Sequence, residues 1–231
     1  MGSTRLPGKV LMAAAGKPML GHLLDRLAFS RTLDGVVVAT TRELRDDPID
    51  AYCRERGTPV FRGSEADVLD RYHGAAAESS LEVIVRVTAD CPLIDPTLVD
   101  EMVELFRAHD GAYDVVTNRN PLTFPDGTDL DVISRSALDE AWTRATLPRH
   151  REHVVPFFWE SGYRVLNHED PSRGFRRHRW TLDYPEDFEL IRRILEALHQ
   201  EGRLFTRHDV LAFLAANPEL PSLNSRYIPP A

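Results

Sequence analysis

Residues 83–93 read Val83-Ile84-Val85-Arg86-Val87-Thr88-Ala89-Asp90-Cys91-Pro92-Leu93. The first six form a nearly continuous β-prone run, which is typical of a strand covered on both faces in a parallel sheet. Polar residues follow directly, and parallel α/β sheets bind their ligands at the carboxyl ends of the strands. This stretch therefore predicts a buried strand with a candidate site at its end.

Strands and helices alternate on both sides of this stretch through the first half of the chain. Apolar residues at helical spacing and β-prone runs distinguish the two kinds of element. We expect helices over 18–29, 46–56, 67–77 and around 98–106, and strands over 36–40, 59–62, 83–88 and 113–117. This alternation implies a parallel sheet with helical crossovers.

The rhythm changes at residue 118. We expect a loop and strand over 118–134, helical stretches around 135–146 and 150–161, a strand at 179–182, an amphipathic helix through 188–198 and a last helix over 206–216. Thr206 has the hydroxyl expected of an N-cap for the last helix. Because no internal repeat is visible, we interpret residues 1–231 as one domain, with 118–175 as an excursion from the sheet.

The composition is that of an ordinary globular chain, with 231 residues, 42% hydrophobic and 28% charged. No run of about 18 apolar residues occurs, so we expect no membrane-spanning helix, and no secretion signal is recognisable. The two cysteines, Cys53 and Cys91, lack zinc-ligand spacing, which favours a reducing, cytoplasmic location. The net charge of −8 argues against nucleic acid as a partner, but a local cationic cluster can still bind a small anion.

Three polar segments stand where such a sheet would bind a ligand. The chain opens with Met1-Gly2-Ser3-Thr4-Arg5-Leu6-Pro7-Gly8-Lys9, whose glycines, hydroxyls and two cations suit phosphate oxygens. Asp90 follows the strand at 83–88, and Asp183 follows the one expected at 179–182. Two such carboxylates can meet at one divalent ion that also takes phosphate oxygens. Singly, the loop could be a turn and each aspartate a helix cap, but together they favour a triphosphate site.

Four motifs, in order along the chain, resemble one family of enzymes. They are the opening loop, Asp67-Val68-Leu69-Asp70-Arg71-Tyr72, Val87-Thr88-Ala89-Asp90-Cys91-Pro92-Leu93 and Arg179-Trp180-Thr181-Leu182-Asp183-Tyr184-Pro185-Glu186-Asp187-Phe188. To about residue 200, the chain resembles the cytidylyltransferases of spore-coat polysaccharide biosynthesis, which are relatives of the acylneuraminate and 3-deoxy-manno-octulosonate cytidylyltransferases. The resemblance implies a Rossmann-like nucleotidyltransferase fold of GT-A type, with three α/β/α layers around a mixed, mainly parallel sheet. It also implies CTP as donor, Mg2+ as cofactor, a homodimer, and acceptor and dimer contacts from 118–175.

The resemblance further implies roles for individual residues. The triphosphate loop is matched by Gly2, Ser3, Thr4, Arg5 and Lys9, the metal-binding aspartates by Asp90 and Asp183, and the base-reading positions by Gly63, Ser64 and Asp67. Catalysis would then rest on Arg5, Lys9, Asp90 and Asp183, and Asp90 would also contact the nucleotide. Glu152 and His153 lie in a stretch that resembles the acceptor side of the family. For Asp129 and Asp131 we favour acceptor contact or a structural role.

One departure concerns the start of the chain. Members of the family carry an apolar strand ending in Gln-Ala-Arg directly before the loop, and that strand is central in their sheet. Here the first strand is missing, since the sequence starts at the corresponding internal methionine. We expect the reading frame to continue upstream, because removing a central strand would expose two ladder edges.

The sequence thus predicts transfer of CMP from CTP to an acidic, nonulosonic acid-like sugar, with release of pyrophosphate, for surface polysaccharide biosynthesis. Two alternatives remain open. Asp129-Leu130-Asp131 has the D-x-D form of metal-dependent glycosyltransferases. The missing first strand would suit a non-catalytic remnant of the fold.

Two further features have simpler readings than a functional one. A basic stretch contains Arg173, Arg176, Arg177, His178 and Arg179, and a solvated turn or dimer surface explains it more simply than anion binding does. Cys91 is more simply a small core residue than a nucleophile, because the sequence places no histidine partner beside it.

Overall fold

The computed structural model describes residues 1–109, 111–172 and 174–228. Its strands are β1 (Ala13–Ala14), β2 (Lys17–Pro18), β3 (Val38–Thr41), β4 (Val60–Gly63), β5 (Val83–Val87), β6 (Val115–Thr117), β7 (Leu130–Ser134) and β8 (Val165–Asn167). Its α-helices are α1 (Met19–Leu27), α2 (Asp47–Glu55), α3 (Val68–Glu78), α4 (Pro96–Ala108), α5 (Arg135–Arg144), α6 (Pro148–His153), α7 (Pro156–Glu160), α8 (Pro185–Leu198) and α9 (Arg207–Ala216). The helices and strands predicted before residue 118 are confirmed to within a few residues.

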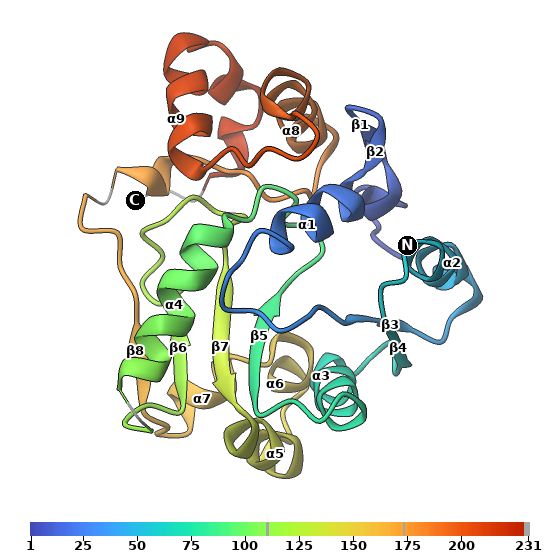
Figure 1. Cartoon of the computed structure of the whole chain (residues 1–231). Coiled ribbons are helices and arrows are strands. Elements are labelled where there is room, and N and C mark those ends of the chain that lie inside the picture. Colours follow the sequence, from blue (N-terminus) through green and yellow to red (C-terminus); the bar gives the residue numbers. More distant parts are fainter. Residues whose placement is uncertain (110, 173, 229–231) are drawn as a thin grey trace.

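The strands form a mixed arrangement. β3 and β4 pair in parallel, β1 and β2 pair antiparallel, and the other four strands form a sheet in the order β5-β7-β6-β8 (Figure 1). Within that sheet β7 runs antiparallel to both β5 and β6, whereas β8 is parallel to β6. The mixed sheet is confirmed, but it is less parallel than the alternation of elements predicts, because β7 lies between β5 and β6.

Residues 118–175 return to the sheet instead of leaving it. They supply β7, which pairs with β5 along Val83–Val87, and β8, which lies at the far edge beside β6. Between these strands, α5, α6 and α7 cover one end of the molecule (Figure 1). The expected excursion from the sheet is therefore wrong for β7 and β8, although the helices between them do lie outside it.

Alternate side chains of the central strands pack into two separate apolar clusters, one on each face of the sheet. Val116 and Val132 pack with the apolar faces of α1, α2 and α4. Their neighbours Val115 and Ile133 point the other way and pack with α3, α5 and α7. A strand that is buried on both faces needs apolar residues at successive positions, which is why these runs do not alternate with polar residues. The predicted α/β/α layering is confirmed.

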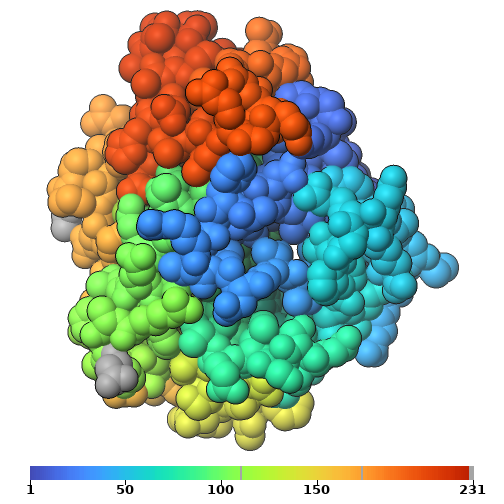
Figure 2. All heavy atoms as spheres, viewed as in Figure 1, coloured from blue at the N-terminus to red at the C-terminus, as the bar shows by residue number. Residues whose placement is uncertain are grey.

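A third apolar cluster joins the two ends of the chain. Leu6 and Met19 pack with Trp180 and Leu182 and with apolar residues of α8 and α9. Figure 2 shows the N-terminal segment in blue touching the C-terminal helices in red and orange. The predicted N-cap of α9 is confirmed, since the Thr206 hydroxyl accepts from the Asp209 N–H. This packing fixes the opening loop against the segment that precedes α8.

Residues 179–182 are extended but do not form the predicted strand. Arg179 makes an isolated bridge to Asp126 on one side. On the other side the Leu182 N–H donates to the Asp90 carbonyl over 2.8 Å. The segment therefore crosses the ends of the strands with only a few hydrogen bonds to Asp126 and to Asp90, and it holds residue 183 close to residue 90.

The single helix predicted over 150–161 is also wrong, because α6 and α7 are two short helices. The break lies at Val154, whose φ is +66°, and Pro156 begins α7. A proline at the first helical position is well suited to starting a new helix and unsuited to continuing an old one. Across the described residues, even α8 with its 14 residues falls short of the apolar helix length that a bilayer requires.

The close approach of Gly127 to the 180–181 segment generates a stability prediction. Gly127 has a φ of +98°, and a Cβ there would lie 2.3 Å from the Thr181 nitrogen, whereas Gly162 has a φ of +77° with open space around it. We predict that Gly127→Ala lowers the free energy of unfolding by more than about 3 kcal/mol, because a backbone clash adds to left-handed strain. Gly162→Ala, the control, should lose about 1 kcal/mol from strain alone. Urea unfolding measures both, and equal losses would contradict this packing.

Candidate functional site

The ammonium of Lys9 lies between the carboxylates of Asp90 and Asp183. Its Nζ is 3.0 Å from Asp90 Oδ2 and 2.9 Å from Asp183 Oδ1. Nη2 of Arg5 is 2.8 Å from the same Asp183 oxygen. Gly8, with a φ of +72°, turns the chain into the short 3-10 helix Lys9–Leu11 and so directs Lys9 inward. The four residues that the family resemblance made catalytic therefore meet at one place.

Burial and charge work against each other at this point. Burial opposes the charged form of Lys9, but the carboxylates of Asp90 and Asp183 outweigh it and raise the pKa of the ammonium. Burial likewise opposes ionisation of Asp183, yet Lys9 and Arg5 hold its pKa below the usual value. Lys9 and Asp183 therefore remain charged at neutral pH. The ammonium of Lys9 is then available to pair with a phosphate oxygen.

The donor set at this point fits a hard divalent cation that shares its ligands with phosphate. Asp90 and Asp183 already place a cation between them, since both accept hydrogen bonds from one ammonium. Over residues 1–109, 111–172 and 174–228, no group of three or more His, Cys, Asp or Glu residues could hold a metal ion. Mg2+ commonly binds through one or two carboxylates plus substrate phosphates. Two carboxylates are therefore enough here only if a ligand supplies further oxygens.

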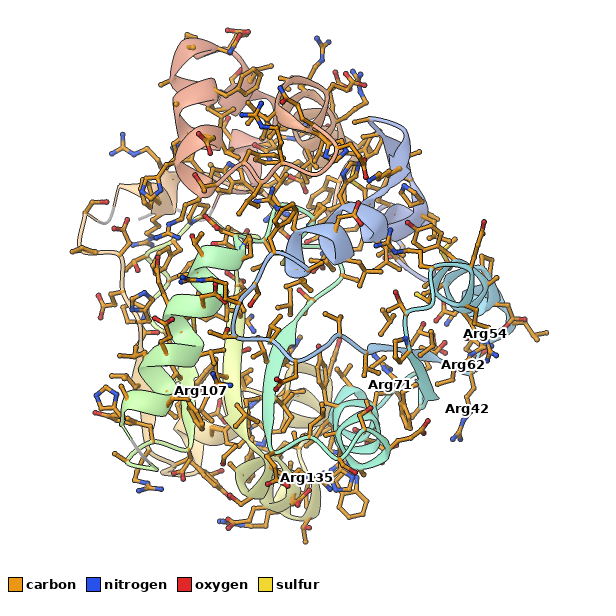
Figure 3. All side chains as sticks on the ribbon, viewed as in Figure 1. Arg42, Arg54, Arg62, Arg71, Arg107 and Arg135 are labelled. Carbon is orange, nitrogen blue, oxygen red and sulfur yellow. The ribbon has the colours of Figure 1, made fainter. Side chains whose placement is uncertain are left out.

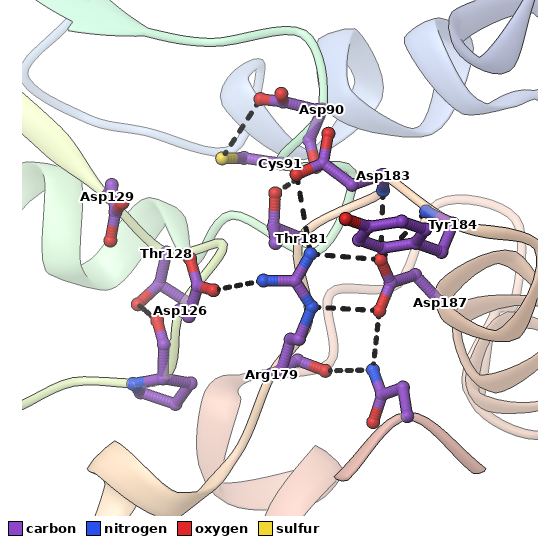
Figure 4. Close-up of polar contacts among 12 residues, drawn as sticks. Asp90, Cys91, Asp126, Thr128, Asp129, Arg179, Thr181, Asp183, Tyr184 and Asp187 are labelled. Atoms are coloured by element: carbon purple, nitrogen blue, oxygen red, sulfur yellow. Dashed lines mark hydrogen bonds and ion pairs between the residues drawn. The ribbon is translucent and has the colours of Figure 1, made fainter. Parts of the chain in front are cut away.

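Arg179 links this centre to a buried carboxylate behind it (Figure 4). Its Nη1 donates to Asp126 over 2.6 Å, its Nη2 to Asp183 over 3.3 Å, and its Nε and Nη2 to Asp187 over 3.0 and 3.1 Å. Asp187 is fully buried and also accepts from the backbone N–H groups of Asp183 and Tyr184. Together Arg179 and Asp187 fix both the side chain and the backbone of Asp183.

Sequence reasoning missed this role of Arg179, because it grouped the residue with a solvated basic stretch. The signal that could have found it is the spacing of Arg179, Asp183 and Asp187 at intervals of four around a helix start. Of that stretch, Arg176 and Arg177 are exposed, His178 is half-buried and Arg179 is buried. Arg173 lies outside the described residues.

The remaining residues of the opening loop lie nearer the surface. The Ser3 hydroxyl accepts from the Leu6 N–H over 3.2 Å and so closes the turn. Gly2 and Thr4 are exposed, and a Cβ at Gly2 would lie 3.0 Å from the Arg45 guanidinium carbon. The structure thus brings Arg5 and Lys9 to the carboxylates, while Ser3 shapes the loop and Gly2 and Thr4 face outward.

The positions expected to read the base surround the start of α3. Gly63 ends β4, and the backbone carbonyls of Ser64 and Glu65 accept hydrogen bonds from Arg71, which is labelled in Figure 3. Asp67 caps α3 through the Asp70 N–H and pairs with Arg151 over 2.6 Å. Both oxygens of Asp67 are therefore already used within the chain.

Other arginines labelled in Figure 3 belong to the outer surface near α2 and β4. Arg54 pairs with Asp50 over 3.0 Å and Arg62 with Asp47 over 2.6 Å. Such exposed pairs contribute little to stability and leave no free cation for a ligand. Arg5 and Lys9 are the cations of the opening loop that reach the carboxylates of Asp90 and Asp183.

The residues expected on the acceptor side do not come together. Glu152 and His153 are exposed on α6, which packs beside α3. Asp131 is fully buried, pairs with Arg86 over 3.0 Å and accepts from the Thr117 hydroxyl over 2.6 Å. Of the two roles considered for Asp131, these contacts favour the structural one, since its carboxylate neutralises a buried arginine of the sheet. Asp129 lies at the end of the loop before β7, where Arg119 forms ion pairs with both Asp129 and Asp131.

Cys91 is buried next to Asp90 and fits the reading as a core residue. Burial, with a smaller contribution from Asp90, raises the pKa of its thiol well above the usual value. A thiol in that state carries little thiolate at neutral pH, so it is a poor nucleophile.

Comparison with known proteins agrees with this arrangement. The family described as cytidylyltransferase matches the chain over residues 1–210. The spore coat polysaccharide biosynthesis protein SpsF of Bacillus subtilis is 32% identical over 228 residues, which cover 95% of this chain and 92% of that protein. The 8-amino-3,8-dideoxy-manno-octulosonate cytidylyltransferase of Shewanella amazonensis is 35% identical over 120 residues, about half of each chain. A solved structure of a cytidylyltransferase from Leptospira borgpetersenii superimposes with a TM-score of 0.90 at 34% identity, covering 96% of this chain and 92% of that one.

The buried pair of Arg179 and Asp187 generates a prediction for stability. Arg179→Met would leave the fully buried Asp187 carboxylate without its cation. We predict a loss of about 3–5 kcal/mol in the free energy of unfolding, because an uncompensated buried charge is strongly destabilising. Arg177→Met, which changes an exposed neighbour, is the control and should change it by less than about 0.5 kcal/mol. Denaturant unfolding monitored by circular dichroism gives both values, and a small loss for Arg179→Met would contradict the role assigned to the pair.

Proposed function

The chain belongs to the cytidylyltransferase family, and we propose that it transfers CMP from CTP to a hydroxyl of an acidic, nonulosonic acid-like sugar, with release of pyrophosphate. The name of SpsF supports a role in surface polysaccharide biosynthesis. The octulosonate cytidylyltransferases support a sugar acid as the acceptor class. The observation that carries the proposal is the single cation, Lys9, held at 3.0 and 2.9 Å between Asp90 and Asp183.

The chain's own residues perform the transfer by placement and charge. Arg5 and Lys9 bind the β- and γ-phosphates of CTP, which offsets the charge that builds on the leaving pyrophosphate. As the phosphates enter, Lys9 exchanges its carboxylate partners for phosphate oxygens. Arg179 and Asp187 keep Asp183 in place while Lys9 is displaced. The acceptor hydroxyl then attacks the α-phosphorus in line with the departing pyrophosphate.

We propose Mg2+ as the cofactor, held by Asp90 and Asp183 together with phosphate oxygens. When bound, it would supply Lewis-acid stabilisation of the phosphate charge. The proposed cellular setting is a homodimer in the cytoplasm, and the two buried cysteines, Cys53 and Cys91, are free thiols as a reducing compartment favours. Metal removal tests the cofactor directly, since EDTA should abolish pyrophosphate release and added Mg2+ should restore it.

The glycosyltransferase alternative has lost its support, because Asp131 of the D-x-D stretch is committed to Arg86 and Thr117. A pyrophosphate-release assay separates the candidate functions. CTP with a sugar acid should release pyrophosphate, and ATP, GTP or UTP should release much less. Release with no combination of nucleotide and acid, or turnover of a nucleotide sugar without pyrophosphate, would overturn the proposal.

Asp90→Asn tests the carboxylate at the end of β5. We predict that it lowers kcat by at least about 100-fold, because one of two anionic ligands for the cation is lost. The fold should survive, since Lys9 keeps its bond to Asp183. Steady-state pyrophosphate release measures the effect, with thermal unfolding as the check on folding. Asp25→Asn, which changes a surface ion pair, is the control, and near-normal turnover by Asp90→Asn would remove this residue from the mechanism.

Lys9→Ala tests the phosphate-binding cation. We predict that KM for CTP rises roughly 10- to 100-fold, the effect of removing one charged hydrogen bond of about 1.5–3 kcal/mol. KM for the acid should stay nearly constant, because Lys9 faces the nucleotide side. Lys17→Ala is the matched control, since Lys17 pairs with Asp25 and Glu201 away from the site. Unchanged KM and kcat for CTP in the Lys9 variant would contradict a phosphate role.

A further inference from the structure

A cavity of about 420 Å³ opens beside Arg179. Its walls come from the loop before β7, which contributes Asp126 and Asp129, and from the segment that contains Arg176, His178 and Arg179. Figure 4 shows Asp126, Asp129 and Arg179 along this side of the site. Since Arg179 also bonds to Asp183, the cavity adjoins the centre formed by Lys9, Asp90 and Asp183. Its volume lies within the range of pockets that hold small ligands.

Some charged groups in the wall have strong partners within the chain, whereas two arginines keep hydrogen-bond donors that no described residue uses. Asp126 pairs with Arg179, and Arg179 in turn pairs with Asp126, Asp183 and Asp187. Arg119 lies 3.5 Å from Asp129 and 3.8 Å from Asp131, and its guanidinium makes no hydrogen bond with any residue in the described ranges. Arg176 is exposed and forms no ion pair within those ranges. The cavity therefore offers two guanidinium groups with donors to spare.

Asp129 supplies the opposite kind of group. Its Oδ1 is buried and has no hydrogen-bond partner within the described part of the chain. Burial raises the pKa of this carboxyl to about 7, with the nearby Asp126, Asp131 and Asp90 adding to the effect and Arg119 opposing it. A buried oxygen without a partner is uncommon and is satisfied when a ligand donates to it. The cavity thus combines a carboxylate that has an unused oxygen with two arginines that have hydrogen-bond donors to spare.

We propose that this cavity receives the sugar acid, with its carboxylate between Arg119 and Arg176 and its attacking hydroxyl donating to the carboxylate of Asp129. This inference rests on the proposed function and identifies the acceptor site and the proton acceptor of that reaction. The hydroxyl oxygen bonds to the α-phosphorus, the bond from the α-phosphorus to the bridging oxygen breaks, and pyrophosphate leaves with the electron pair. The hydroxyl proton passes to Asp129.

The chemistry of the wall selects for a ligand that is both anionic and hydroxylated. A neutral sugar would leave the spare donors of Arg119 and Arg176 unused. A ligand with charge alone would place anionic oxygen against Asp129, which is unfavourable while that carboxylate is ionised. A sugar acid satisfies both groups at once.

Asp129→Asn tests the proton acceptor, because the amide keeps the shape of the side chain but cannot take the proton. We expect kcat to fall at least about 100-fold, the usual contribution of a general base, with KM for CTP unchanged. The wild-type kcat should rise with pH through about 7 as Asp129 ionises, and the variant should lack that rise. The melting temperature should be unchanged or higher, since a buried charge is removed. Asp34→Asn, at an exposed position, is the control.

Two results would overturn the role of Asp129. One is a wild-type kcat for the variant at every pH. The other is a fall in activity accompanied by a lower melting temperature and a higher KM for CTP, which would indicate a structural role. Pyrophosphate release by the wild-type protein reports on the transfer itself. Its absence with every acid would count against the proposed function, whereas release that is insensitive to Asp129→Asn would count against this inference alone.

Calorimetry tests the cationic end without requiring turnover. The probes are N-acetylneuraminate, 3-deoxy-manno-octulosonate and their methyl esters, titrated into the protein with CMP present. At least one acid should bind the wild-type protein about tenfold more tightly than its ester. Arg176→Gln should remove this preference, whereas Arg177→Gln, which changes the exposed neighbour outside the cavity, should retain it. Binding of neither acid, equal binding of acid and ester, or the same loss in both variants would overturn the proposal.

Discussion

One ammonium group held between two carboxylates is the interaction on which the rest of this site depends. Lys9 comes from the opening loop, Asp90 from the end of β5 and Asp183 from the start of α8, so three distant segments meet at one nitrogen. Two carboxylates this close repel each other unless a cation lies between them. The fold therefore has to keep positive charge at this point, whether it comes from Lys9 or from a ligand-bound ion.

The surrounding structure is arranged to keep those three segments in register. Leu6 anchors the loop in the cluster built from Trp180, Leu182 and the last two long helices. Behind Asp183, the fully buried Asp187 and Arg179 fix the chain before α8. Arg179 also forms part of the wall of the cavity proposed for the acceptor, so one side chain contacts both Asp183 and that cavity. Placement of this kind is what phosphoryl and nucleotidyl transfer demand of a protein.

The sequence predicts the local elements and the central site well, because both produce recognisable patterns within short stretches of sequence. The buried strand at 83–87, the Thr206 cap and the meeting of Asp90 with Asp183 follow from apolar runs, capping chemistry and position at strand ends. Which strands pair with one another is not encoded in any short stretch, so the sequence did not predict the insertion of β7 between β5 and β6. The buried roles of Asp131 and Arg179 were missed for the same reason. A charged residue is normally assigned to the surface, and the buried partners, Arg86 for Asp131 and Asp187 for Arg179, become known only from the fold. Glu152 and His153 were assigned by resemblance alone, and the fold places them on the outside of α6.

The most direct test of the account is a crystal structure of the protein soaked with CTP and Mn2+, which substitutes for Mg2+ and gives an anomalous signal. The account predicts one anomalous peak bonded to the carboxylates of Asp90 and Asp183 and to phosphate oxygens, with the Lys9 ammonium moved onto the β- or γ-phosphate. A peak at Asp129 and Asp131, or CTP bound with Lys9 still bridging Asp90 and Asp183, would contradict it.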